Sequence, residues 1–196
     1  MNLRIATEAD ARGVAEIYAP IVASSPISFE IDPPDAAEMR RRIRDVLPAY
    51  PWLVCETQGQ IAGYAYAGAH GTRAGYLWSV NTSVYVHPTF HRRGVGTSLY
   101  ELLFDVLVAQ GYVKAFAGIT LPNPGSVGLH EATGFRLVGV YEQSGFKDGV
   151  WYDVGWWQRP LQPIPEEPKQ PLTIVELARD PAWVTRLRAD RFGDEP

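Results

Sequence analysis

The sequence contains a single cysteine, Cys55, among 196 residues. One thiol cannot form an internal disulfide or a cysteine-based zinc cluster, and we expect no resident metal. Cys55 belongs to the apolar run Trp52–Cys55, which is typical of a strand. A buried, unreactive thiol is therefore favoured over a nucleophile.

An excess of basic charge and long apolar runs are also lacking. Lysine and arginine number 18 against 22 acidic residues, which gives a net charge of −4. This balance offers no global attraction to nucleic acid or to an anionic membrane, so any basic site must be local. No apolar run approaches the ~20 residues of a membrane helix, and Met1–Ile5 contain no apolar signal core. We expect a cytoplasmic protein without nucleic acid or membrane partners.

The composition that is present predicts one compact domain followed by an extension. The chain is 46% hydrophobic and long enough for a single substantial core. Prolines at positions 160, 163, 165, 168 and 171 then change the composition. We expect a folded domain over residues 1–160 and a proline-rich extension over residues 161–196, which is a linker or an extended arm. A short helix is expected between about residues 172 and 192, interrupted by Pro181.

Apolar periodicity predicts the elements of the domain. We expect strands at residues 2–5, 52–56, 61–69, 77–86, 114–121, 136–146 and 150–159. Helices are expected from residue 7 to about residue 21 and at residues 35–47, 95–109 and 124–133. This order predicts an α/β (α+β) fold, with a mixed, mostly antiparallel central sheet and helices on both faces.

The segment between the expected strand 77–86 and helix 95–109 reads His91-Arg92-Arg93-Gly94-Val95-Gly96-Thr97. Its glycines let the backbone approach a ligand, and the N–H groups and dipole at a helix start attract an anion. The two arginines add charge suited to a pyrophosphate. The spacing fits neither a P-loop nor a Rossmann fingerprint. An ordinary loop with surface arginines is the alternative, and for a bare G-x-G it is the favoured one.

This segment resembles the pyrophosphate-binding Q/R-x-x-G-x-G/A loop of the GNAT superfamily of N-acetyltransferases, with His91 in place of the usual Gln or Arg. The stretch L-P-N-P-G-S-V-G-L-H-E-A-T-G-F resembles the second signature of that superfamily. The segments P-W-L-V-C-E, G-Y-A-Y-A-G, S-V-Y-V-H-P and G-F-K-D-G-V-W-Y-D-V-G-W-W-Q are similar to the phosphinothricin and methionine sulfoximine N-acetyltransferases, in the same order over roughly residues 2–160. The resemblance implies an acyl-CoA N-acyltransferase fold, acetyl-coenzyme A as cosubstrate and a homodimer.

The resemblance also implies roles for residues on the cofactor side. Val84, Tyr85 and Val86 would pair with the pantetheine amides, and a main-chain N–H near Val86 would polarise the thioester carbonyl. The pyrophosphate would be held by Arg92, Arg93, Gly94, Val95, Gly96 and Thr97. Asn123 would hydrogen-bond the pantetheine arm, with Ser126 beside it. From the residues alone, Val84–Val86 is also plain strand core and Asn123 is a turn-former.

On the acceptor side, the resemblance implies that Arg73 and Tyr76 grip the acid group of an amino acid substrate. It also implies that Phe29 forms a pocket wall. A guanidinium can fork onto a carboxylate, phosphinate or sulfone oxygen, and a phenol can donate beside it. An arginine that faces solvent is the alternative for Arg73.

Acetyl transfer needs a neutral amine, whereas an α-amino group with a pKa of about 7.7–8.0 or higher arrives mostly protonated. Members of the family place a Glu in the strand before S-V-Y-V to remove this proton, and Asn81 stands there in this sequence. An amide only orients water or the amine. His130 lies four residues before Gly134, where many members carry a tyrosine, and is the remaining candidate to protonate the thiolate or to accept a proton through water. A packed or capping histidine is the alternative.

Three functional hypotheses follow. The first is direct acetylation of a small amine such as phosphinothricin, methionine sulfoximine or sulfone, or an analogue. The second is acetylation of a protein N-terminus or a polyamine, against which Arg73 argues. The third is a coenzyme A-binding sensor or interaction module with weakened catalysis, which Asn81 supports. Four aromatic residues of the last strand supply either the homodimer interface or core packing, namely Trp151, Tyr152, Trp156 and Trp157.

Overall fold

The computed structural model describes residues 1–181 and residue 183. Seven strands form one sheet in the order β1-β2-β3-β4-β5-β7-β6. The strands are β1 (Asn2–Ile5), β2 (Trp52–Thr57), β3 (Gln60–Ala69), β4 (Ser79–Val86), β5 (Lys114–Leu121), β6 (Arg136–Lys147) and β7 (Val150–Pro160). The α-helices are α1 (Ala11–Ser24), α2 (Ala36–Val46), α3 (Val95–Gln110), α4 (Pro124–Ala132) and α5 (Ile174–Leu177). Single 3-10 turns are η1 (Glu8–Asp10), η2 (Ala74–Tyr76) and η3 (Pro88–Phe90).

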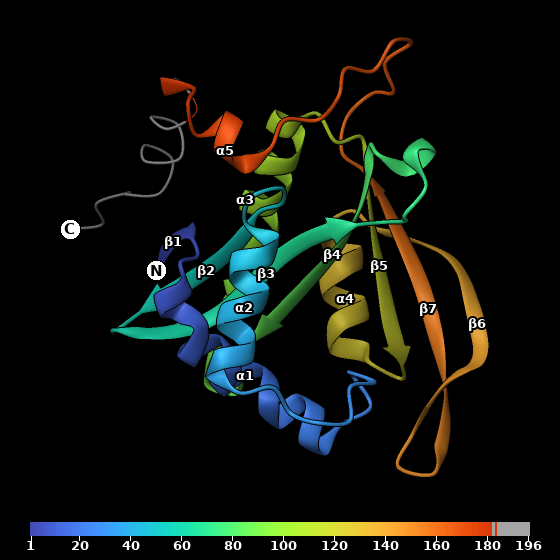
Figure 1. Ribbon diagram of the computed structural model, residues 1–196. Coiled ribbons are helices and arrows are strands. Elements are labelled where there is room, and N and C mark those ends of the chain that lie inside the picture. Colours follow the sequence, from blue (N-terminus) through green and yellow to red (C-terminus); the bar gives the residue numbers. More distant parts are fainter. Residues whose placement is uncertain (182, 184–196) are drawn as a thin grey trace.

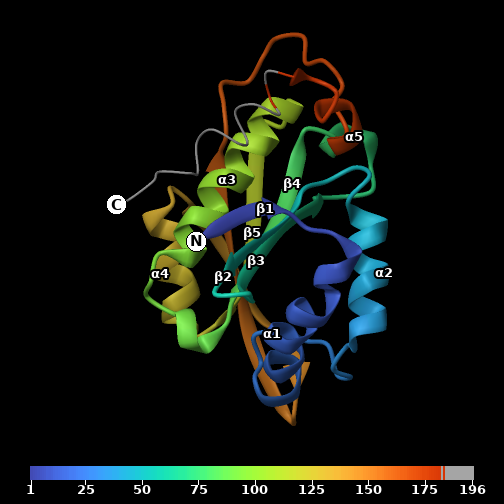
Figure 2. The same ribbon diagram turned by 90° about the vertical axis from the view of Figure 1, so that its left-hand side faces the viewer.

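The strand pairs of the sheet are antiparallel except for β4 and β5, which are parallel. Helices α1 and α2 lie on one face of the sheet, and α3 and α4 lie on the other (Figures 1 and 2). The prediction of a mixed, mostly antiparallel sheet with helices on both faces is therefore confirmed.

The side chains of β3 alternate between the two faces of the sheet, and they determine which helices pack on each face. Tyr64 and Tyr66 belong to the cluster under α1 and α2, whereas Ala65 and Ala67 belong to the cluster under α3. Successive side chains of a strand point to opposite faces, so aromatic rings gather on the α1–α2 face. The alanines on the other face let α3 approach the sheet closely.

Two glycines bound α3. Gly94 precedes it with φ of 80° and Gly111 follows it with φ of 99°, both in the left-handed region that glycine tolerates best. Gly63 of β3 faces the first turn of this helix, where a Cβ would lie 2.9 Å from Val95 Cγ1 and 2.9 Å from Tyr85 O. The start of α3 is thus seated directly on β3 and β4.

The strand expected at residues 77–86 begins only at Ser79. The residues before it form the turn η2, in which the Leu77 N–H donates to Ala74 O at 3.1 Å. Leu77 is apolar but ends this turn and does not belong to the strand. The turn places Tyr76 beside the sheet. Cys55 is buried, and burial raises the pKa of its thiol, as expected for an unreactive cysteine.

The proline-rich segment packs on the domain. The Leu172 N–H donates to Gln110 O at 2.7 Å, and the Trp78 indole donates to Lys169 O at 2.7 Å. Of the helix expected between about residues 172 and 192, α5 covers Ile174–Leu177, while residues 182 and 184–192 of its range lie outside the described residues. Division of the chain at residue 160 stays a prediction. In the part of the chain that the structure describes, no helix is long and apolar enough to cross a membrane.

Candidate active site

Strands β4 and β5 lie side by side only at their start. Their pairing covers Ser79–Asn81 on β4 and Lys114–Phe116 on β5, although β4 continues to Val86 and β5 to Leu121. The two strands diverge beyond that point (Figure 1). Backbone groups on this edge of β4 therefore have no strand partner there, and an unpaired edge can bind an extended ligand that carries amides.

The wide end of this gap faces the loop that starts α3. Arg92 and Gly94 have φ of 58° and 80°, so the chain turns sharply into the helix. The side chains of Arg92 and Arg93 are exposed, and the His91 ring returns to β4, with Nε2 3.0 Å from Val86 O. The first N–H groups of an α-helix lack helical partners and carry the positive end of its dipole. Together with the two arginines beside them, these groups are the ones for which an anion site is predicted.

The close approach of α3 to α4 depends on Gly96. A Cβ at this position would lie 2.8 Å from Leu129 Cδ2 and 3.6 Å from Val86 Cγ2. The second glycine of the loop therefore lets the start of α3 pack closely against Leu129, in the second half of α4.

Asn123 caps α4. Its Oδ1 accepts the Ser126 N–H at 3.1 Å. This oxygen therefore has the structural role that was expected of a turn-forming residue. Its Nδ2 has no hydrogen-bond partner within residues 1–181 and is left to donate to a ligand. Val84 and Val86 pack against the α3 core, and the Tyr85 ring lies edge-on to Tyr18 with centroids 5.0 Å apart. The predicted cofactor residues thus lie on the unpaired part of β4, in the loop that starts α3 and at the cap of α4.

His130 lies in the core on the α3–α4 face and is 4% exposed. Its Nε2 lies 2.7 Å from Tyr100 Oη, and its Nδ1 lies 2.7 Å from Ser126 O. The carbonyl can only accept, so Nδ1 carries the hydrogen and Nε2 accepts from the phenol. Burial lowers the pKa of His130, and the hydrogen bond to the Ser126 backbone opposes this only in part. The surroundings favour the packed alternative, and a proton-transfer role for His130 stays a prediction.

Replacing His130 with glutamine should make the free energy of unfolding fall less steeply as the pH is lowered into mild acid. Because the pKa is lower in the folded state, the unfolded chain takes up the proton first as the pH falls. The stabilisation is therefore complete above about pH 6.5, the ordinary value for histidine, and is lost as the pH falls below it. Urea unfolding at several pH values between about 7 and 5 measures this slope. Equal slopes for wild type and His130→Gln would contradict the assignment.

A second cluster lies on the α1–α2 face, where β4 and β5 part. Asn81 Oδ1 lies 2.8 Å from Nδ1 of His70. The His70 ring stacks on Phe116 with centroids 4.0 Å apart and an interplanar angle of 17°. Tyr76 and Trp156 meet the same ring edge-on, with centroids at 5.5 and 6.4 Å. The residue in place of the expected Glu is therefore hydrogen-bonded to a histidine.

Sequence reasoning missed His70. The alternation of β3 contains the relevant signal, because Tyr64, Tyr66 and Gly68 share the α1–α2 face and His70 continues that series. Gly68 pairs with Asn81, but this register is known only from the folded sheet.

The predicted substrate residues lie in two places. Tyr76 contacts His70, and Arg73 begins the same turn with its side chain exposed. Phe29 lies instead against the β6–β7 hairpin, where a Cβ on Gly145 would overlap its ring. The structure therefore joins Tyr76 to the Asn81 cluster and places Phe29 at the hairpin.

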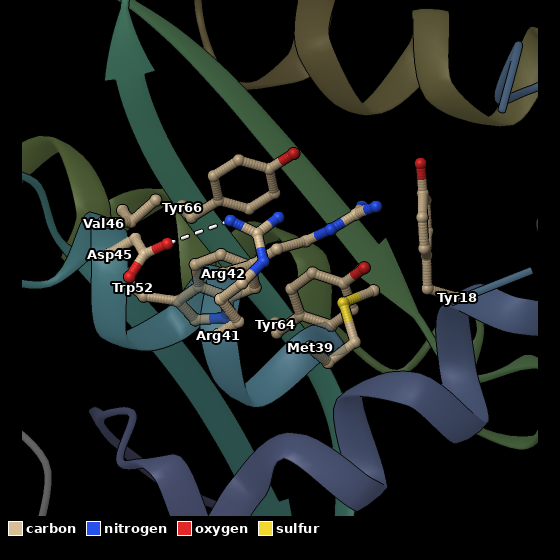
Figure 3. A pocket seen from close by; sticks show the side chains of 9 residues that line it. All are labelled: Tyr18, Met39, Arg41, Arg42, Asp45, Val46, Trp52, Tyr64 and Tyr66. Carbon is tan, nitrogen blue, oxygen red and sulfur yellow. Dashed lines mark hydrogen bonds and ion pairs between the residues drawn. The ribbon is translucent and has the colours of Figure 1, made fainter. Parts of the chain in front are cut away.

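A cavity of about 250 Å³ lies between α2 and the sheet on the same face (Figure 3). It is lined by Tyr18, Met39, Arg41, Arg42, Asp45, Val46, Trp52, Tyr64 and Tyr66. Tyr66 and Gly68 are neighbours on the same face of β3, and Gly68 pairs with Asn81. The cavity therefore borders the Asn81 cluster. Neither Arg73 nor Tyr76 lines it.

The family model of the acetyltransferase (GNAT) domain matches residues 3–156. The chain belongs to the GNAT acetyltransferase family. The phosphinothricin N-acetyltransferase of Streptomyces viridochromogenes is 39% identical over 89% of this chain and 96% of its own length. An L-methionine sulfoximine/L-methionine sulfone acetyltransferase of Salmonella typhimurium is 32% identical over 82% of this chain and 95% of its own.

The crystal structure of a GNAT phosphinothricin acetyltransferase from Sinorhizobium meliloti, in complex with acetyl-coenzyme A, has a TM-score of 0.77. It is 37% identical over 81% of this chain and 87% of that one. The predicted family, the acyl-CoA N-acyltransferase fold and an acetyl-coenzyme A-dependent N-acetyltransferase activity are confirmed.

Proposed function

We propose that this GNAT acetyltransferase acetylates the amine of a small amino acid analogue such as phosphinothricin, methionine sulfoximine or methionine sulfone. The gap between β4 and β5 carries this proposal. Its wide end has the cationic start of α3, and its narrow end has the Asn81 cluster with Tyr76 and Arg73 beside it. One end suits a diphosphate, and the other suits a small substrate that carries an acid group and an amine.

When bound, acetyl-coenzyme A supplies the acetyl group as a thioester. Arg92, Arg93 and the first N–H groups of α3 would hold its diphosphate. The free edge of Val84–Val86 would bond its amides, and Asn123 Nδ2 would donate to the same arm. The chain's own contribution is to position the arm between two strands and to exclude water with the α3–α4 packing.

On the acceptor side, Arg73 would bind the acid group of the substrate, with the Tyr76 phenol as a second donor. The Trp156 indole adds a third, because its Nε1 is buried without a hydrogen-bond partner in the described part of the chain. An unsatisfied buried donor costs about 1–3 kcal/mol, so a substrate oxygen placed there would be favoured. A cationic polyamine has no acid group that Arg73 could bind.

A thiol-release assay with a panel of amino acid analogues tests the proposal. Arg73→Gln should raise KM for the acidic analogues by about 10–100-fold, because a charge-assisted hydrogen bond contributes about 1.5–3 kcal/mol. Its kcat should change much less. Arg12→Gln is the matched control, since Arg12 is exposed on α1 and pairs with Glu16.

Two results of this assay would overturn the proposal. Binding of acetyl-coenzyme A without turnover of any amine would favour the sensor hypothesis. Preference for a polyamine or for a peptide N-terminus would favour the second hypothesis.

We also propose that β6 forms the interface of a homodimer. β6 is an edge strand of the sheet, and its hairpin with β7 exposes several large apolar side chains. They are Leu137, Val138, Val140, Tyr141, Phe146, Val150 and Trp151. Of the four aromatic residues expected there, Trp151 is 59% exposed, whereas Trp157 is 3% exposed and belongs to the core. A cytoplasmic location stays a prediction.

A further inference from the structure

We propose that His70, oriented by Asn81, is the general base that takes the proton from the attacking amine. This role rests on the proposed acetylation of a small amine. It accounts for the missing Glu, because the proton acceptor has moved from β4 to the end of β3 while Asn81 supports it. Asn81 is then a positioning residue and not the acceptor itself.

The hydrogen bonds around Asn81 determine which nitrogen of His70 is free. Asn81 Nδ2 lies 3.4 Å from the carbonyl oxygen of Ala69, which can only accept. Asn81 Oδ1 is therefore the atom that faces His70 Nδ1, at 2.8 Å. An amide oxygen accepts, so Nδ1 carries the hydrogen and Nε2 carries the lone pair. Within residues 1–181, Nε2 has no hydrogen-bond partner.

The position of the pair along the gap agrees with this role. A diphosphate at the start of α3 lies at the wide end, so the thioester at the far end of the arm lies toward the narrow end. That end is the Asn81–Phe116 pair, on which His70 stacks. The five steps along β4 from Asn81 to Val86 span about 16 Å at about 3.3 Å per residue, which accommodates an extended arm.

The His70 ring is also held in place by aromatic side chains. Phe116 on β5 stacks on one face of the imidazole, while Tyr76 on η2 and Trp156 on β7 meet it edge-on. Together with Asn81 on β4, these are the ring and hydrogen-bond contacts of His70 among the described residues, and Tyr76 is the one titratable group in the set. No carboxylate in that set competes for the proton, and imidazole exchanges protons readily near neutral pH.

The proposed step balances as follows. The substrate ammonium transfers one proton to His70 Nε2, which leaves a neutral amine and an imidazolium. The amine lone pair forms the C–N bond to the acetyl carbon while the C–S bond breaks and its electron pair leaves with sulfur. A second proton passes from the new amide nitrogen to the sulfur, and His70 returns its proton to solvent. The products are the acetylated amine, the free thiol and one proton.

His70→Gln tests this role by kinetics. A positioned general base contributes about 10²–10⁴-fold, so kcat/KM at pH 7 should fall by that factor. The deficit should shrink as the pH rises, because more of the amine is then already neutral. Binding of acetyl-coenzyme A, measured by calorimetry, should be unchanged. His87→Gln removes an imidazole that bonds only its own turn through Thr89, and it should keep wild-type activity.

A rescue variant separates proton transfer from folding. Asn81→Glu combined with His70→Gln returns a carboxylate to the β4 position, and it should recover at least about tenfold of the lost activity. Nitrogen NMR of the histidine rings gives a readout independent of turnover. Neutral His70 should show a protonated Nδ1 and an unprotonated Nε2, and Asn81→Ala should remove this preference.

The outcomes separate this role from the proposed function. If wild type turns over amino acid analogues and His70→Gln is equally fast, the role of His70 is wrong while the function stands. A protonated Nε2 in the neutral ring would overturn the role regardless of activity. If wild type binds acetyl-coenzyme A but turns over no amine, the proposed function fails and the base assignment fails with it.

Discussion

Replacement of Arg92 and Arg93 by glutamate should weaken the binding of acetyl-coenzyme A by about 100-fold or more. Two charge-assisted hydrogen bonds contribute about 1.5–3 kcal/mol each, and their sum corresponds to at least two powers of ten in Kd. Both side chains are exposed before α3, so the folded state should lose little stability. Titration calorimetry with acetyl-coenzyme A measures the change.

The control for this variant carries the same change of net charge elsewhere. Arg40→Glu with Arg44→Glu alters the exposed face of α2, and it should leave Kd within about threefold of wild type. Salt should weaken wild-type binding more than that of the Arg92 and Arg93 variant, because ionic screening acts on the charges that were removed. Equal affinity of wild type and variant would place the diphosphate away from the start of α3.

Replacement of Lys147 by methionine should lower the free energy of unfolding by about 2–4 kcal/mol. Lys147 lies at the end of β6, is 4% exposed, and its Nζ donates to Val22 O at 2.6 Å and to Ser28 O at 2.8 Å. Methionine keeps the length of the side chain but leaves both buried carbonyls without this donor. Urea unfolding at pH 7 measures the difference.

The same contact has a consequence for the substrate. Ser28 precedes Phe29, whose ring packs on Gly145 of the same strand, so Lys147 ties the loop between α1 and α2 to the hairpin. Lys147→Met should therefore also raise KM for the amine. Lys169→Met is the control, because Lys169 offers its backbone carbonyl to Trp78 and its side chain is exposed. If the free energy of unfolding of Lys147→Met stayed within about 0.5 kcal/mol of wild type, the carbonyls of Val22 and Ser28 would have found other partners.

The prediction for the cofactor side rests on signals that are contiguous in the sequence. The two glycines and two arginines before α3 lie within one turn, and their effects on backbone and charge act locally. The end of α3 at Gly111 and the cap of α4 at Asn123 depend on single residues in the same way. The strand expected from residue 77 was wrong at its start, because a short turn overrode a local apolar pattern.

The acceptor side could be predicted only in part. Tyr76 and Asn81 were singled out by resemblance, and their roles stay predictions. Both contact the ring of His70, which directly follows β3, and this contact is known only from the folded sheet. Likewise, Lys147 reads as an ordinary hairpin lysine until its contact with Val22, 125 residues away, is known. His130 was marked by its place in a motif, and its partner Tyr100 comes from a different helix.

The amino-acid sequence alone determined the family of this protein, the order of its elements and the glycine-containing start of α3, because each depends on neighbouring residues in the chain. The tertiary structure decided which side chain is available to accept the amine's proton. That choice depends on the registers of β3, β4 and β5, which bring His70, Asn81 and Phe116 together. Strand register is a property of the packed sheet, and a shift of one residue would turn Asn81 to the opposite face.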